Sequence, residues 1–456
     1  MDAAIAFARN VTRTRFEDLP PAAVEVTKKD ILDSLGVALA GSKAPGGRQA
    51  IQLAKRWRGK RESTIIADGS KVPSVNAAWA NGCLVHALDY DDIHHAAVLH
   101  AGAPVVPAAL AVAEMVGNVS GKEFITAVTL GIDLECRMGL AREGPRMWLL
   151  TQAYGVFGAA AAAGRLLGLD EEKLVDALGI AYFQASGNAQ AITDAAIVRG
   201  IVGGFAAKGG VLAALLAQMN VTGPRNSLEG KFGLYRLYHQ GQYNPQALTV
   251  ELGKRFEGVN LSFKRYPCCA RNHAFIEAAL ELKQKHGIRP EDVETVTLFV
   301  GKDAFDEVCD PVEIRRKPPT TVDAQLSALY TVALALAGRK INLGAFSPEA
   351  IKDPVVLGIA GKVTPHLDPA LSRKQMEPAV VEVRLVGGKT VRASQMEWAY
   401  AESENPMPMH DLADKFRDCA SHMAKPLAPD NIEKAIGMLT GLEELDDVSR
   451  VVRLLG

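Results

Sequence analysis

The stretch that decides the fold is residues 148–164, WLLTQAYGVFGAAAAAG, an apolar run rich in alanine and glycine. It is too short for a membrane span of ~20 residues and carries Thr151 and Gln152, so it predicts a helix buried on all sides inside a large protein. Residues 198–219 have the same texture and are interrupted by Arg199 and Lys208. The small residues in these runs let helix backbones approach closely, and the aromatic content of 6% favours packed helices over sandwiches.

Helix signals continue on both sides of this run. Pro20-Pro21 precede an apolar segment over 22–40, and Gly41 is a natural stop. Ser120 and Glu123 form a capping box that predicts a helix to about residue 140. Asp170 is expected to cap another helix.

The pattern changes after residue 264. Residues 293–300 (VETVTLFV) alternate as a half-buried strand does, and 380–386 with 389–393 predict a hairpin closed by Gly387-Gly388. We expect helices at 273–286, at 323–337 and after 347–349, and again from 400 to 455. The expected fold is mainly α: a discontinuous all-helical domain, residues 1–264 and 400–456, with an inserted α+β domain over 265–399.

Composition excludes several classes of protein. The chain has 456 residues, 48% of them hydrophobic and 23% charged, which is typical of a globular protein and not of a disordered one. The formal charge of −1 argues against general binding to nucleic acid or to a membrane surface. Six cysteines without a C-x-x-C pair and an N-terminus interrupted by Arg9, Arg13 and Arg15 predict a soluble, cytoplasmic chain.

Polar groups are densest in residues 81–107, NGCLVHALDYDDIHHAAVLHAGAPVVP. This stretch holds four of the ten histidines together with three aspartates: His86, His94, His95, His100, Asp89, Asp91 and Asp92. Three interpretations stay open, namely a metal site, acid/base or substrate-binding groups, and a structural network. The D-x-D-D-x-H-H spacing fits no strong metal motif, so no metal is expected.

A second cluster, KRYPCCARNH at 264–273, contains three basic residues and a histidine at the expected domain boundary. Such a position suits an anionic substrate, because pockets prefer domain interfaces. The alternative is a basic helix terminus, and Cys268 and Cys269 are expected to be small buried hydrophobic residues. The basic run at 55–61 is expected to be a solvated helix end, and the absence of a G-x-S-x-G motif argues against a hydrolase.

Together these segments resemble the MmgE/PrpD family, which contains 2-methylcitrate dehydratases, cis-aconitate decarboxylases and iminodisuccinate epimerases. The matching motifs run over nearly the whole chain: DSLGVALAGS (33–42), HALDYDDIH (86–94), HAGAPVVPAALAVAE (100–114), GVFGAAAAAGRLLGLD (155–170), GVLAALLAQ (210–218) and KRYPCCARNHAFIEAALEL (264–282). The resemblance implies a helical domain and an α+β lid with the active site between them, a homodimer, and no metal or organic cofactor.

The resemblance also implies which residues act. Family members move a proton at a carbon beside a carboxylate of a small di- or tricarboxylate, which needs a positioned base and cations. The residues carried over as catalytic are His100, Asp89, Tyr330 and His273. Those carried over as substrate-binding are Arg199, Lys264, Gln152 and His94.

The chain departs from the family pattern at several of these positions. Gln152 stands where a proton-transferring histidine is usual, and a glutamine amide is no base near neutral pH. Arg199 replaces a lysine and is a far poorer proton carrier, although it keeps the charge. Val202 replaces a second histidine, Ile93 a threonine and Ala101 a proline.

The sequence therefore predicts a cofactor-independent lyase that acts on a small di- or tricarboxylate by dehydration or a related elimination. His100 is the expected acid/base group, oriented by Asp89, with Tyr330 donating a proton or closing the site. Two alternatives stay open: an epimerase or isomerase of a dicarboxylate such as an iminodisuccinate, and a non-catalytic carboxylate-binding relative. No nucleic-acid or membrane partner is expected.

Overall fold

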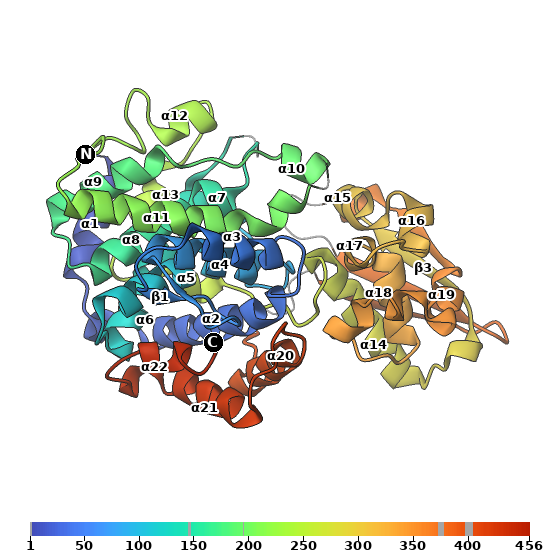
Figure 1. Cartoon of the computed structure of the whole chain (residues 1–456). Coiled ribbons are helices and arrows are strands. Elements are labelled where there is room, and N and C mark those ends of the chain that lie inside the picture. The colour runs from blue at the N-terminus through green and yellow to red at the C-terminus, as the bar shows by residue number, and fades with distance from the viewer. Residues whose placement is uncertain (1, 145–146, 195, 373–377, 397–404) are drawn as a thin grey trace. The chain divides into compact units, whose positions relative to one another are not determined.

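The computed structural model describes residues 2–144, 147–194, 196–372, 378–396 and 405–456 (Figure 1). The chain is mainly helical, as expected, and divides into two compact units. One unit comprises Met1–Phe263 and Glu402–Gly456, and the other comprises Lys264–Ala401. Each unit has its own hydrophobic core.

The described residues of the first unit form helices and a small antiparallel strand pair, β1 (Ser63–Thr64) with β2 (Lys71–Val72). The prediction that this domain is all-helical is therefore wrong in this detail. Its helices are α1 (Ala3–Arg13), α2 (Pro21–Gly41), α3 (Gly47–Trp57), α4 (Ser74–His86), α5 (Gly102–Val116), α6 (Gly121–Ala141), α7 (Leu150–Ala153), α8 (Gly155–Leu166), α9 (Glu171–Tyr182), α10 (Gln190–Thr193), α11 (Val202–Gln218), α12 (Leu234–Tyr238), α13 (Pro245–Thr249), α20 (Met409–Ser421), α21 (Pro429–Thr440) and α22 (Ser449–Val452).

Small residues bring the central helices of this unit into backbone contact. A Cβ atom on Gly82 of α4 would lie 2.8 Å from the Cα atom of Gly204 in α11, and one on Gly158 of α8 would lie 2.7 Å from the Gly131 carbonyl oxygen in α6. The close packing predicted from the alanine and glycine runs is therefore confirmed. The prediction of one helix over 148–164 is wrong, because the chain forms α7 and then α8 with a break at Tyr154.

The helix caps of the sequence are present, with one difference. Ser120 accepts a hydrogen bond from the Glu123 N–H, and Asp170 accepts one from the Lys173 N–H. The Glu123 carboxylate does not complete the predicted capping box, because it forms an ion pair with the Arg165 Nε at 2.7 Å. Helix α6 therefore has the serine cap alone. A partner that is distant in the sequence competed successfully for that side chain.

The C-terminal helices return to the N-terminal part of the first unit. Helices α20 and α21 pack against α2, and α22 packs against α5 (Figure 1). This return places Lys415 of α20 in the interior, where it forms an ion pair with Asp33 of α2.

The second unit is a small α+β unit. Its helices are α14 (Ala270–His286), α15 (Lys302–Ala304), α16 (Val312–Arg316), α17 (Thr321–Gln325), α18 (Ala328–Leu336) and α19 (Pro354–Ala360). Its four-stranded sheet has the order β4 (Val363–Leu367), β3 (Val293–Val300), β5 (Pro378–Leu385) and β6 (Thr390–Met396).

The strand at 293–300 and the hairpin closed by Gly387-Gly388 are confirmed, but three details differ from the predictions. The sheet is mixed, because β4 lies parallel to β3 while β5 is antiparallel to both of its neighbours. The helix expected over 323–337 breaks into α17 and α18, since Ser327 caps the second of them. The signal at 347–349 precedes a single 3₁₀ turn, and Asp353 caps the helix that follows it.

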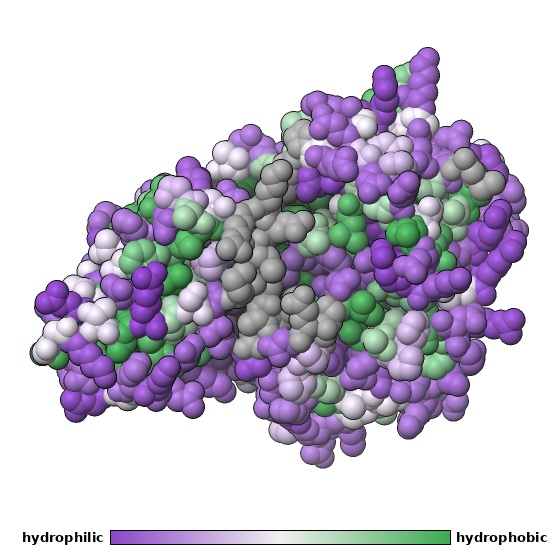
Figure 2. Space-filling model, turned by 180° about the vertical axis from the view of Figure 1, so that it is seen from behind, coloured by the Kyte–Doolittle hydropathy of each residue, from purple (hydrophilic) through white to green (hydrophobic). Residues whose placement is uncertain are grey.

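The longest apolar helical stretch of the described residues lies mostly in the interior. By length and composition, the helical stretch Ile197–Gln218 could cross a membrane, but 61% of its most apolar window is buried inside the protein, as in the core helix of a globular unit. On the face shown in Figure 2, hydrophilic residues dominate and hydrophobic residues form separate patches. That distribution is ordinary for a protein surface in water.

Candidate active site

The segment between α4 and α5 is shaped by its own polar side chains. The Asp92 carboxylate accepts hydrogen bonds from the N–H groups of Ala101 at 2.8 Å and Gly102 at 3.0 Å, so it satisfies the N-terminus of α5. The Asp89 backbone is left-handed with φ of 50°, a conformation that aspartate tolerates better than most residues. The loop is thereby folded back between the end of one helix and the start of the next.

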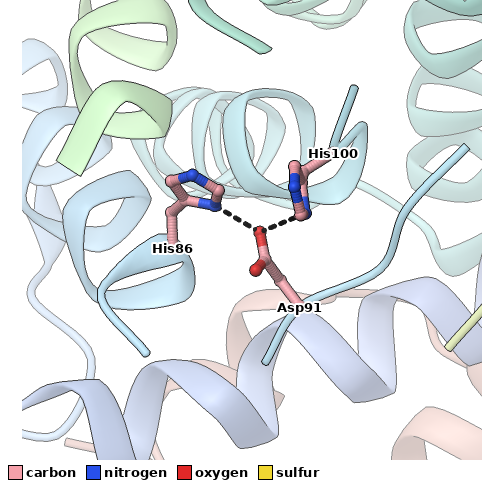
Figure 3. Close-up of side chains that lie close together, drawn as sticks. All are labelled: His86, Asp91 and His100. Atoms are coloured by element: carbon pink, nitrogen blue, oxygen red, sulfur yellow. Dashed lines mark hydrogen bonds and ion pairs between the residues drawn. The ribbon is translucent and has the colours of Figure 1, made fainter. Parts of the chain in front are cut away.

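This folding brings His86, Asp91 and His100 together (Figure 3). The His86 Nδ1 lies 2.7 Å from the Asp91 Oδ2, and the His100 Nδ1 lies 3.5 Å from the same oxygen. Asp91 is fully buried, whereas the His100 side chain is 15% exposed. The two imidazole rings meet edge to face with their centroids 4.7 Å apart.

The geometry suits His100 for proton transfer. Its Nδ1 lies 3.5 Å from a buried carboxylate oxygen, and a proton on Nδ1 leaves a free electron pair on Nε2. The carboxylate also stabilises the imidazolium that forms when Nε2 takes a proton. The predicted partner was Asp89, but the structure records Asp91 beside the His100 ring, and Asp89 forms an ion pair elsewhere.

Buried carboxyl groups lie behind this cluster. Burial, followed by the nearby Asp91 carboxylate, raises the pKa of Asp92, although its two backbone hydrogen bonds act in the opposite direction. Burial and the Asp92 carboxylate likewise raise the pKa values of Asp30 and Glu135 well above their usual range. The interior beside the site is therefore rich in acid groups that hold protons more tightly than exposed ones do.

One cation lies close to these acids. The Lys415 Nζ is 2.6 Å from the Asp33 Oδ1 and donates to the Tyr90 carbonyl oxygen at 2.7 Å. It also lies 3.9 Å from the centre of the Tyr90 ring. Lys415 thus connects α20 and α2 to the loop that carries Asp91.

Asp89 and Arg199 form a second pair in the same unit. The Arg199 Nη2 lies 3.3 Å from the Asp89 Oδ2, and the arginine side chain is 35% exposed. Arg199 belongs to the 3₁₀ turn Ile197–Ile201 that precedes α11. An accessible guanidinium held by a carboxylate can grip a ligand carboxylate in two-pronged fashion.

Gln152 and His94 have local partners. The Gln152 Nε2 donates to the Ser186 Oγ at 2.7 Å, and the preceding Thr151 Oγ1 accepts a hydrogen bond from the His100 N–H at 3.1 Å. The His94 Nδ1 accepts from the Ala97 N–H at 3.1 Å, and burial lowers the pKa of His94 to about 4. In this structure His94 is a buried ring that closes a turn, and its role in substrate binding stays a prediction.

Lys264, His273 and Tyr330 belong to the second unit. Lys264 is buried, and the His273 ring contacts Tyr266 through its Nε2, 3.1 Å from the Tyr266 carbonyl oxygen. The buried Tyr330 hydroxyl donates to the Ala345 carbonyl at 3.0 Å, and burial raises its pKa to about 12. The hydroxyl is thus held within its own unit, and the catalytic role of Tyr330 stays a prediction.

His86 and Asp91 were missing from the predicted site residues. Both stand in the polar stretch at 81–107, and the signal that could have found them is a histidine at the end of an apolar helix, five residues before an aspartate. A cavity of about 560 Å³ elsewhere in the first unit is lined by other residues, among them Arg48, Lys55 and Lys425. None of His86, Asp91 and His100 lines that cavity.

The fold and the site define a mainly helical protein with a buried carboxylate–imidazole cluster at a helix junction. Residues 5–246 match the model of the MmgE/PrpD N-terminal domain, and residues 266–438 match that of the MmgE/PrpD C-terminal domain. The chain belongs to the MmgE/PrpD family.

Named relatives indicate the chemistry of this family. The chain is 27% identical to a cis-aconitate decarboxylase-like protein of Aspergillus oryzae, over 98% of this chain and 95% of that protein. It is 26% identical to a cis-aconitate decarboxylase of Aspergillus terreus, over 96% and 93%. It is 21% identical to a 2-methylcitrate dehydratase of Cupriavidus necator, over 80% and 78%. The names of these relatives refer to decarboxylation of cis-aconitate and to dehydration of 2-methylcitrate.

Proposed function

We propose that this protein is a cofactor-independent lyase that acts on a small tricarboxylate of the aconitate or methylcitrate class. The observation that carries the proposal is the His100 imidazole, partly exposed, with its Nδ1 3.5 Å from the fully buried Asp91 carboxylate. The near full-length similarity to cis-aconitate decarboxylases supports decarboxylation ahead of the dehydration that the sequence favoured.

In this proposal the His100 Nε2 carries the reacting proton. A decarboxylation breaks the bond between a carboxyl carbon and its neighbour, and the electron pair left on the substrate must be protonated at a carbon beside another carboxylate. A dehydration begins with removal of a proton from such a carbon. Both reactions need one well-placed acid or base, and Asp91 stabilises the imidazolium form in either direction.

Substrate carboxylates require cations. Arg199 is a partly exposed cation of the first unit and lies beside Asp89. We assign Arg199 to bind one substrate carboxylate. Lys264 and His273 are assigned to carboxylate binding by family resemblance. Gln152 is assigned a hydrogen-bonding role, because its amide cannot carry a proton at neutral pH.

Proton NMR in D₂O tests the reaction directly. The purified protein is incubated with cis-aconitate and, separately, with 2-methylcitrate, and the spectra are followed over hours. Decarboxylation is expected to yield a product with one carboxyl group fewer and deuterium at the newly protonated carbon. A His100→Ala variant is expected to lose at least ~100-fold in rate, and a His410→Ala variant, whose side chain is 79% exposed, serves as the matched control.

The other outcomes separate the alternatives. Deuterium in otherwise unchanged substrate would favour an epimerase. Thermal stabilisation by a tricarboxylate without any spectral change would favour a carboxylate-binding relative. Full activity in His100→Ala would remove His100 from the mechanism.

We propose, again from the family resemblance, that the protein is a cytoplasmic homodimer. Sedimentation velocity at micromolar concentration measures the oligomeric state. A monomer over that range would contradict the dimer.

A further inference from the structure

Three ligand-type atoms converge at the His86–Asp91–His100 cluster. One ring nitrogen of each histidine and a carboxylate oxygen of Asp91 all lie within 4.8 Å of one another. Both histidines contact the same oxygen, as the dashed lines of Figure 3 show: the His86 Nδ1 by a hydrogen bond and the His100 Nδ1 as an ion pair. The three side chains come from the end of α4, the following loop and the residue two places before α5, so the packing of these helices holds them in position.

Two imidazoles and one carboxylate are a ligand set that binds zinc and related divalent metals, with water completing the coordination shell. Metal–ligand bonds of about 2.0–2.1 Å in tetrahedral geometry place neighbouring ligand atoms about 3.3–3.4 Å apart. The two nitrogen–oxygen distances here, 2.7 and 3.5 Å, lie on either side of that value. The His86 Nδ1 would have to move away from the Asp91 Oδ2 to admit a metal ion between them.

The surroundings favour a cation at this point. His86 is the last residue of α4, where the partial negative charge of the helix C-terminus lies. The Asp91 carboxylate is fully buried beside both imidazoles. The His100 side chain is 15% exposed although its Nδ1 is buried, so a movement of this ring would admit the ion and a water ligand.

We propose that His86, Asp91 and His100 bind a divalent transition metal such as Zn²⁺, and that the bound metal inhibits the enzyme. The inhibition rests on the proposed function, whereas the metal site does not. A metal on the His100 Nδ1 leaves the proton of the neutral ring on Nε2, so Nε2 loses the electron pair with which it would accept a substrate proton. The metal also replaces the hydrogen bond between the His86 Nδ1 and the Asp91 Oδ2.

Cobalt(II) is the probe for the site. The purified full-length protein is titrated with Co²⁺, and the visible absorption band of the bound ion is expected to saturate at one equivalent and to disappear when Zn²⁺ is added. His86→Gln is expected to weaken binding by at least ~100-fold, since changes to second-shell partners alone cost 10–100-fold. His410→Ala, on an exposed histidine, is the matched control and should bind Co²⁺ as the unmodified protein does.

A measurement on the unmodified protein avoids any loss of folding in the variant. Diethyl pyrocarbonate modifies neutral imidazoles, and peptide mass spectrometry reports the modification of His100. One equivalent of Zn²⁺ is expected to protect His100 while the exposed His410 continues to react. Equal labelling of His100 with and without zinc would overturn the metal site.

Activity then separates the two parts of the proposal. Where cis-aconitate is turned over, Zn²⁺ should abolish turnover with the same half-saturation as binding, and faster turnover would overturn the inhibition. Where no tricarboxylate reacts, the proposed function fails, but the cobalt and labelling results still decide the metal site. Absence of one-to-one cobalt binding overturns the metal site whatever the activity.

Discussion

Replacement of Lys415 by methionine tests how the carboxyl-rich interior is stabilised. The Lys415 and Asp33 side chains are 6% and 0% exposed and their charged atoms are 2.6 Å apart. At an effective dielectric constant of about 20, two unit charges at that distance attract by about 6 kcal/mol, a gain that desolvation of both groups offsets. Removal of one partner of such a pair leaves an uncompensated buried charge and costs about 3–5 kcal/mol.

Urea unfolding followed by far-ultraviolet circular dichroism measures this cost. With an m value of about 3 kcal/mol/M, a loss of 4 kcal/mol lowers the midpoint by about 1.3 M. Lys434→Met, on the exposed side of α21, is the matched control and should change the free energy of unfolding by no more than about 0.5 kcal/mol. A Lys415→Met midpoint equal to that of the control would refute the argument.

A double substitution identifies the cause of the loss. Asp33→Asn combined with Lys415→Met removes both charges, and it should recover about half or more of the lost stability, because replacing a whole buried pair is often nearly neutral. If the double variant were no more stable than Lys415→Met, the loss would come from packing and not from an uncompensated carboxylate.

Three further predictions concern single positions. Gly102→Ala places a Cβ atom 2.5 Å from the Ser34 Oγ and should cost about 1–3 kcal/mol by thermal unfolding, whereas Gly437→Ala, with open space around it, should be neutral or stabilising. Burial raises the pKa of Glu135 above its ordinary value of 4.5. Just above pH 4.5 the carboxyl group therefore keeps its proton in the folded protein and loses it in the unfolded chain. The contribution of Glu135 to the free energy of unfolding consequently falls as the pH rises above 4.5. Glu135→Gln should therefore gain stability relative to the unmodified protein as the pH rises from 4.5 toward the raised pKa of the folded state, by up to about 1.4 kcal/mol per pH unit. Parallel pH profiles of the two proteins would contradict this. Arg199→Met should raise KM for a reacting tricarboxylate by about 10- to 100-fold, because it removes a charge-assisted hydrogen bond, and should change kcat less. An unchanged KM would refute carboxylate binding by Arg199.

Local signals in the sequence were enough for most of the secondary structure. The Ser120 and Asp170 caps, the strand at 293–300 and the Gly387-Gly388 turn depend on residues within a few positions of one another, and all are present. Errors came where a distant partner intervened. Glu123 left its capping box for Arg165, and β4 joined the sheet in parallel to a strand more than sixty residues earlier in the chain.

The sequence by itself determined the mainly helical fold, the family and the stretch that carries the chemistry, because these depend on local periodicity and on motif order. Only the tertiary structure decided which side chains of that stretch meet. Asp89 and Asp91 are two residues apart, yet one pairs with Arg199 and the other lies between His86 and His100. The physical reason is that Asp92 fastens the loop to the start of α5, and the direction of each neighbouring side chain follows from that anchor and from the packing of α4 against α5.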